Sequence, residues 1–238
     1  MALPKLNVPV YEAILPSTEK VIKYRPFLVK EEKLLLTAQE SGEDAVLPAV
    51  KQIIKNCVQG ELDVDNMPIF DMEYLFLRLR AKSVGEEVTL GLKPWGCPQN
   101  DGKLCKFTTE VTINLEEIEC KLDKKHSSKI MLDDNVGLMM KYPDLSQVGI
   151  KGSETEMGMK VIKNCVKMIF TEEETHERDS FTDKELDDFI DNLNSKQMEQ
   201  INNFFETMPT IKHTAKYTCK TCDEEKETTI QGLQSFFG

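Results

Sequence analysis

The stretch Tyr217-Thr218-Cys219-Lys220-Thr221-Cys222-Asp223 decides how the rest of this chain is organised. A Cys-x-x-Cys turn can hold two thiolates on one metal ion, but a closed tetrahedral site needs two more ligands. A second pair lies far upstream, where seven residues separate Cys97 from Cys105. We expect the two pairs to bind one structural zinc ion per chain, because four cysteine ligands leave no coordination position for a substrate.

Each cysteine pair lies at the tip of a predicted β-hairpin. Period-two alternation predicts strands at 88–92 and 107–115 around the first pair, and at 213–217 and 227–230 around the second. Cysteines at paired hairpin tips are typical of a zinc ribbon, here divided by a long insertion. The sequence therefore predicts a split four-cysteine zinc-ribbon-like module.

The upstream turn is longer than a usual zinc knuckle, whose cysteines are two to four residues apart. It holds good loop formers, so an enlarged knuckle is expected; these are Pro98, Asn100, Asp101 and Gly102. His213 is the reserve metal ligand if either upstream cysteine turns away. Two alternatives stay open: a pair of hairpins with unligated thiols, and a redox pair at Cys219 and Cys222. A redox pair usually precedes a helix, whereas a strand is predicted here.

The composition describes a globular, acidic chain. It has 238 residues, 40% of them hydrophobic, and a formal net charge of -11. Such a charge repels phosphate backbones and anionic lipid surfaces, so we expect no nucleic-acid partner. No apolar run approaches the length of a membrane span, and the N-terminus lacks the order of a secretory signal. Seven cysteines, an odd number, favour reduced thiols in a cytoplasmic chain over a disulfide framework.

The expected fold class is α+β: mainly a helical bundle, with the split zinc-ribbon-like module and an N-terminal β-hairpin arm. Hydrophobic periodicity divides the chain into five parts. These are an extended arm at 1–29, part of a helical bundle at 30–82, the split module at 83–118 and 209–232, an insertion with short strands and helices at 119–208, and an apolar tail at 233–238.

Three local expectations concern the helices and the charged segments. The apolar positions of 156–170 predict one amphipathic helix, and the charged run at 171–179 predicts a solvated loop. Arg78 suits the C-terminal end of a predicted helix at 70–82, with anion binding as the alternative. His126 is expected to be an exposed histidine in a polar segment.

Motifs of catalysis are missing from the sequence. It holds no phosphate-cradling glycine loop and no nucleophile elbow, and its three histidines lie in polar contexts. Paired carboxylates are abundant only because acidic residues are abundant. We therefore expect a non-enzymatic protein.

Several longer motifs resemble the baseplate hub protein family of T4-type tailed bacteriophages, over nearly the whole chain. They are Ile22 to Lys33 (IKYRPFLVKEEK), Phe70-Asp71-x-Glu73-Tyr74-Leu75-Phe76-x-x-Leu79-Arg80-Ala81-x-Ser83-Val84-Gly85, Phe204-Phe205-x-Thr207-Met208-Pro209, Tyr217-x-Cys219-x-x-Cys222 and Gly232-Leu233-x-x-Phe236-Phe237. Members of that family often carry a compact Cys-x-x-Cys at the upstream site, whereas this chain has the longer Cys97 to Cys105 turn.

The resemblance implies a structural or assembly role in the central hub of the tail baseplate, in the host cytoplasm during assembly or in the finished virion. The implied partners are other hub or tail proteins. They would bind the N-terminal arm, with Tyr24 and Phe27, or the apolar tail, with Phe236 and Phe237. The alternative is a zinc-ribbon adaptor that contacts nucleic acid or the transcription machinery. The basic, aromatic hairpin face that this alternative requires is diluted by acidic residues.

Overall fold

The computed structural model describes residues 6–97, 101–147 and 152–232. In that part of the chain it has six α-helices and four small sheets, so the expected mixture of helices and strands is confirmed. The finer expectation of a mainly helical bundle is not confirmed, because strands occur along the whole described chain, between the helices as well as around them.

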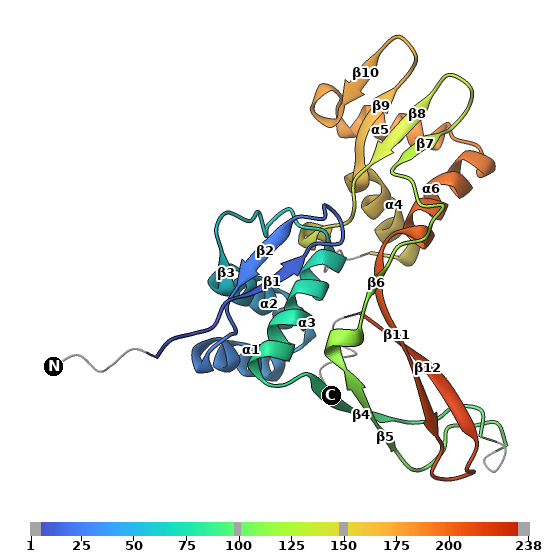
Figure 1. The fold of residues 1–238 in the computed structure, drawn as a ribbon. Helices are drawn as coiled ribbons and strands as arrows, with labels where there is room; N and C mark the ends of the chain where they lie inside the picture. Colours follow the sequence, from blue (N-terminus) through green and yellow to red (C-terminus); the bar gives the residue numbers. More distant parts are fainter. Residues whose placement is uncertain (1–5, 98–100, 148–151, 233–238) are drawn as a thin grey trace. The chain divides into compact units, whose positions relative to one another are not determined.

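The chain folds into two compact units, each of which is assembled from separate segments (Figure 1). The first consists of the described parts of Met1–Val64, Phe70–Lys121 and Thr210–Gly238. The second consists of Asp65–Ile69 and the described part of Leu122–Pro209. The C-terminal hairpin thus folds with the N-terminal half of the chain.

The first unit begins with the predicted hairpin, in which β1 (Tyr11–Ile14) pairs antiparallel with β2 (Val21–Tyr24). Strand β3 (Val58–Gln59) extends the sheet on the other side of β2. Helices α1 (Val29–Ser41) and α2 (Glu43–Cys57) contact each other. Glu31, buried in the first turn of α1, accepts hydrogen bonds from the Leu28 amide and from Arg25, so the buried charge is paired.

Helix α3 (Ile69–Ser83) is the centre of the first unit. Apolar residues are buried around its whole circumference, which a helix at the surface could not tolerate. They are Phe70, Met72, Leu75, Phe76, Leu77, Leu79 and Ala81. Tyr24 of β2 packs above this helix and donates to the Arg78 carbonyl over 3.5 Å.

Two long hairpins complete the first unit. Strand β4 (Glu87–Leu92) pairs with β5 (Thr109–Asn114), and the chain then passes through the short helix η2 (Leu115–Glu117) into β6 (Cys120–Lys121). Strand β11 (Thr210–Thr218) pairs with β12 (Glu225–Gln231) along its length and with β6 at its beginning. Figure 1 shows the two hairpins running side by side, and β11 contacts β5.

The described part of the second unit is a four-stranded antiparallel sheet with three helices. Its strand order is β10-β9-β8-β7, made by β7 (Lys129–Met131), β8 (Gly137–Met140), β9 (Val166–Phe170) and β10 (Thr175–Glu177). The helices are α4 (Glu154–Cys165), α5 (Asp183–Asp191) and α6 (Ser195–Thr207), and short 3-10 turns lie at Leu145–Gln147 and Arg178–Ser180. Capping boxes begin all three helices, for example Thr182 with Glu185 at α5.

Two expectations for this unit were wrong. The helix predicted at 156–170 ends at Cys165, and Val166–Phe170 continues as strand β9, whose β-branched and aromatic residues pair with β8 and β10. The charged run at 171–179 is not only a loop, because Thr175–Glu177 forms the edge strand β10. An edge strand with one face in solvent accepts charged residues. Such a strand therefore lacks the alternation of hydrophobic residues by which strands are recognised in a sequence.

In the described ranges, we find no helix that combines the length and the apolar character needed to cross a membrane.

Candidate metal centre

Three cysteine side chains from two hairpins meet in the first unit. The sulfur atoms of Cys97, Cys105 and Cys219 all lie within 4.8 Å of one another, and all three residues are at most 3% exposed. Cys222 packs against this cluster. The structure thus brings together the four cysteines that the sequence pairs, although more than a hundred residues separate the two turns.

The spacing of the sulfur atoms fits a metal site better than a disulfide. The Cys105 and Cys219 sulfurs lie 3.4 Å apart, whereas a disulfide bond is about 2.05 Å long. All seven cysteines lie in the described ranges, and none of them forms a disulfide there. Zinc–sulfur bonds of about 2.3 Å place tetrahedral thiolates about 3.8 Å apart, so these sulfurs need to move little to bind zinc.

The downstream turn has the geometry of a metal knuckle. The Cys219 amide donates to the Glu224 carbonyl over 2.9 Å, and the Asp223 amide donates to the Cys219 carbonyl over 2.9 Å. Asp223, directly after the second cysteine, has a φ of 54°, which turns the chain back into β12. The amides of Thr221 and Cys222 point at the Cys219 sulfur. The backbone is therefore arranged to stabilise a thiolate at Cys219.

The upstream turn is longer, but it also places its two cysteines at the sulfur cluster. Gly96, just before Cys97, has a φ of 74°, which a residue with a Cβ rarely adopts. The Cys105 amide donates to the Pro94 carbonyl over 2.9 Å, and the Gly102 amide to the Cys97 carbonyl over 3.2 Å. These bonds close the loop at its base, so both cysteines of the enlarged turn face inward.

Polar contacts join the two turns around the sulfur cluster. Thr109 of β5, 4% exposed, accepts a hydrogen bond from the Lys220 amide over 3.4 Å. The Lys226 ammonium bonds the Gly96 carbonyl at 3.3 Å and the Glu224 carboxylate at 2.9 Å. The turns are held in register by these contacts as well as by the sulfur cluster.

The pKa values of the downstream thiols diverge. The Thr221 amide lowers the pKa of Cys219 to about 6, against the effect of burial. For Cys222 the Glu224 amide also acts to lower the pKa, but burial and the neighbouring Cys97 and Cys219 sulfurs raise it to about 11. One thiolate is thus favoured in the cluster without a metal, and each further negative charge is opposed. A divalent cation reverses this opposition by neutralising the charges.

The other sequence-predicted site residues lie away from the cluster. His213 lies in β11, which ends directly before Cys219; six residues separate the two along the chain, about 20 Å at about 3.3 Å per residue. Tyr24 and Phe27 are 2% and 7% exposed, so in this structure their side chains stabilise the core of the first unit. Phe236 and Phe237 lie outside the described residues.

Of the three remaining cysteines, Cys57 and Cys165 are buried in the core, whereas Cys120 is partly exposed. Burial raises the pKa of Cys57 and of Cys165 to about 11. For Cys120, burial and then the charges of Asp71 and Glu73 raise the pKa to about 12. Thiols of this kind are poor nucleophiles and poor metal ligands.

Sequence reasoning missed the role of Arg78. Its guanidinium donates to the carbonyls of Leu115, Glu116 and Ile118 at 2.6–3.2 Å, and it stacks on the Tyr74 ring. It is therefore engaged in fixing η2 to α3 and is not a free anion-binding group. A single arginine on an amphipathic pattern gives no signal for such a role, because its acceptors are backbone atoms far along the chain.

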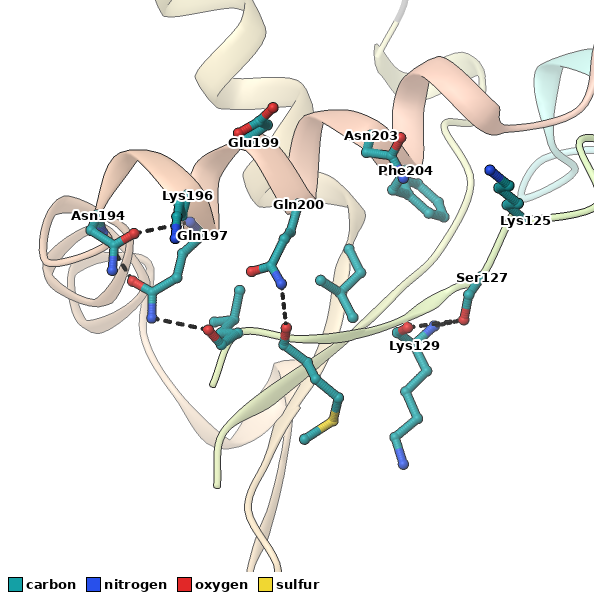
Figure 2. Close-up of a pocket in the computed structure, with 13 residues that line it drawn as sticks. Lys125, Ser127, Lys129, Asn194, Lys196, Gln197, Glu199, Gln200, Asn203 and Phe204 are labelled. Atoms are coloured by element: carbon teal, nitrogen blue, oxygen red, sulfur yellow. Dashed lines mark hydrogen bonds between the residues drawn. The ribbon is translucent and has the colours of Figure 1, made fainter. Parts of the chain in front are cut away.

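A polar groove of about 570 Å³ lies in the second unit, between α6 and β7. Figure 2 shows Gln197 and Gln200 reaching from α6 toward the strand, where their amides bond the carbonyls of Leu132 and Met131 at 3.3 and 2.9 Å. These two glutamines are therefore used to hold the helix on the strand. We assign no chemistry to this groove.

Comparison with known proteins identifies the family of the chain. A family model described as T4 bacteriophage base plate protein matches residues 8–238, which is almost the entire sequence. Neither the curated proteins nor the solved structures gave a match. The family model spans both folding units and both cysteine turns. The chain therefore belongs to the T4 bacteriophage base plate protein family.

Proposed function

We propose that the protein is a non-enzymatic component or assembly factor of the phage baseplate hub, and that Cys97, Cys105, Cys219 and Cys222 hold one structural zinc ion in it. The observation that carries the metal proposal is the meeting of buried thiols from two hairpin turns. Family membership carries the baseplate role. The hub assignment rests on the motifs shared with hub proteins.

A structural role for the metal follows from the donor set. Four cysteine ligands complete a tetrahedral zinc site, so no position remains for water or substrate. The ion would join β4–β5 to β11–β12, and hence the N-terminal half of the chain to its last strands. Since ligands must be brought together before they bind, the free energy of zinc binding would stabilise this arrangement of the hairpins.

The hairpin surface argues against the nucleic-acid adaptor. Lys226 is paired with Glu224, and acidic residues stand beside the other lysines of these strands. A nucleic-acid surface needs unpaired basic side chains, with aromatic side chains among them. Partners in the baseplate are therefore the better proposal, with the chain acting in the host cytoplasm during assembly.

The test is a phage in which this gene is inactivated and supplied from a plasmid. Without the protein, we expect electron microscopy of infected cells to show tails or tail parts that lack complete baseplates, and complementation should restore infective particles. Mass spectrometry of purified virions then separates a retained hub subunit from a factor that leaves. Normal baseplates and normal yields without the gene product would refute the assembly role.

A further inference from the structure

The free edge of strand β1 is an unprotected pairing surface. Leu15 donates to the Lys20 carbonyl over 3.0 Å, so Leu15 and Lys20 form a hydrogen-bonded pair of the β1–β2 hairpin. Hydrogen-bonded and non-bonded pairs alternate in an antiparallel ladder. The N–H and C=O groups of Ile14 and Glu12 therefore point away from β2, toward the free edge. Val10 directly precedes β1, and by the same alternation we expect its backbone groups to point the same way.

Nothing in the described chain caps these outward groups. The described hydrogen bonds of Glu12 and Ile14 leave their outward backbone atoms without an acceptor or donor. Three β-branched side chains lie on the outer face at this edge: Val10, Ile14 and Val21 are 48%, 56% and 52% exposed. Charged residues, prolines and bulges usually protect an edge strand, whereas β1 has only Glu12.

Strand β7 in the second unit shows how this protein protects an edge. Its outward carbonyl at Met131 is bonded by Gln200, and the Ser127 hydroxyl bonds both the amide and the carbonyl of Lys129 (Figure 2). Helix α6 supplies a second glutamine at the carbonyl of Leu132. The outward backbone groups of β7 are bonded, whereas those of β1 are not, and this difference indicates that β1 can pair with another strand.

We propose that a second copy of this protein pairs with β1 through its own β1, in an antiparallel arrangement centred on Glu12. Between Pro9 and Pro16, only Val10, Glu12 and Ile14 have backbone N–H and C=O groups that point outward. The edge is therefore five residues long, and two copies can pair over all five residues when Glu12 lies at the centre. Each Ile14 then faces the second copy's Val10. This pairing covers the apolar side chains that a monomer exposes.

The inner face is complementary in the same register. The second copy's Tyr11 lies opposite Ala13, a large residue beside a small one. A groove of about 530 Å³ lies along β1 and can receive the added ring; Tyr11, Ala13 and Tyr74 line it, as do Glu12 and Ile14 of the outer face. The two Glu12 carboxylates meet at the twofold axis, and each lies 3.5 Å from Lys23 of its own chain. Lys23 offsets the repulsion between them.

The test compares two substitutions at one position. Glu12→Pro removes only the outward N–H, because Glu12 makes no ladder bond to β2, while Glu12→Ala keeps the N–H and removes the repelling charge. Sedimentation equilibrium at 0.15 M salt should show a reversible dimer for the wild type and an equal or tighter dimer for Glu12→Ala. Glu12→Pro should raise the dissociation constant at least about tenfold. Circular dichroism and metal content should match among the three.

Cysteine cross-linking fixes the register and remains informative if the proline variant misfolds. In the proposed pairing, Val10 and the second copy's Ile14 form a hydrogen-bonded pair about 5.5 Å apart at Cα, within disulfide range. A mixture of Val10→Cys and Ile14→Cys proteins should therefore form a cross-linked dimer under mild oxidation, and neither protein alone should do so. The proposal is overturned by a wild-type monomer at every concentration, by a Glu12→Pro dimer as tight as Glu12→Ala, or by absent cross-linking in the mixture.

Discussion

At the residue scale, single polar side chains make packing contacts and hydrogen bonds that the sequence does not reveal. His126 was expected to be exposed, yet it stacks on Tyr142 and packs at a tilt against Phe204. Its two ring nitrogens bond Thr207 and Tyr142, both at 3.0 Å. Residues more than fifty positions away in the sequence supply two of these contacts, which no local pattern could indicate.

His126 leads to a pH prediction for the second unit. Burial lowers the pKa of this imidazole below 6.5, although Asp123 opposes the shift. The unfolded chain then binds the proton more tightly than the folded chain. The stability contributed by neutral His126 should be present above pH 6.5 and decline as the pH falls through the lower pKa of the folded state. Denaturant unfolding of wild type and His126→Gln between pH 5 and 8 checks this, and parallel pH curves would contradict it.

Arg78 provides a second prediction at this scale. Arg78→Ala leaves three carbonyls around η2 without their donor, and the free energy of unfolding should fall by about 2–3 kcal/mol. Arg78→Lys is the matched control, since it keeps the charge but cannot fork to three acceptors. We expect it to recover only part of the loss in chemical denaturation. Full recovery by lysine would show that charge alone matters at this position.

At the scale of elements, the sequence predicted most helices and hairpins and failed at changes of element. The segment predicted as helical at 30–82 covers α1, α2 and α3 to within one residue at each end, and the predicted insertion at 119–208 contains α5 and α6. The error at 156–170 falls where a helix becomes a strand without an intervening loop, at Cys165 to Val166. Val, Ile and Met continue a helical pattern as readily as they begin a strand, so only pairing with neighbours decides.

Two glycines test the packing of the second unit. A Cβ added to Gly137 of β8 would overlap the Phe170 ring of β9 and lie 3.0 Å from the Met131 sulfur. Gly137→Ala should therefore destabilise the protein by about 1–3 kcal/mol. Gly158→Ala is the control: nothing lies within 4 Å of its added Cβ in α4, so it should stabilise by about 0.5–1 kcal/mol. Thermal melts that shift in the same direction for both variants would contradict this packing.

At the scale of the whole molecule, the sequence predicted that the four cysteines would meet and could not predict how the chain divides. Each cysteine pair lies in a turn between two predicted strands, and this repeated pattern indicates that both pairs belong to one metal site. The two units instead depend on which distant segments pack together, such as Asp65–Ile69 with Leu122–Pro209, and this is set by tertiary contacts. The same limit applies to Tyr24 and Phe27, proposed as partner-binding residues, whose burial involves contacts with Arg78 and Phe76 of α3.

The division into units predicts a local response to metal removal. If zinc joins the two hairpins, a chelator should increase amide exchange in β4, β5, β11 and β12 and leave the core strands of the second unit protected. Hydrogen exchange with mass spectrometry, with and without chelator, measures both regions in one experiment. Equal loss of protection in both units would show that the metal supports the whole molecule instead of the hairpins.

The most direct test of the proposed four-cysteine zinc site is the zinc content of the purified chain. Elemental analysis of protein made without chelator should give about one zinc per chain. Cys219→Ser should lower that content and unfold the hairpins, whereas Cys57→Ala, which removes a buried thiol outside the cluster, should retain the metal. A folded wild-type protein without stoichiometric metal, or a Cys219→Ser protein with unchanged metal and unchanged hairpins, would contradict the account.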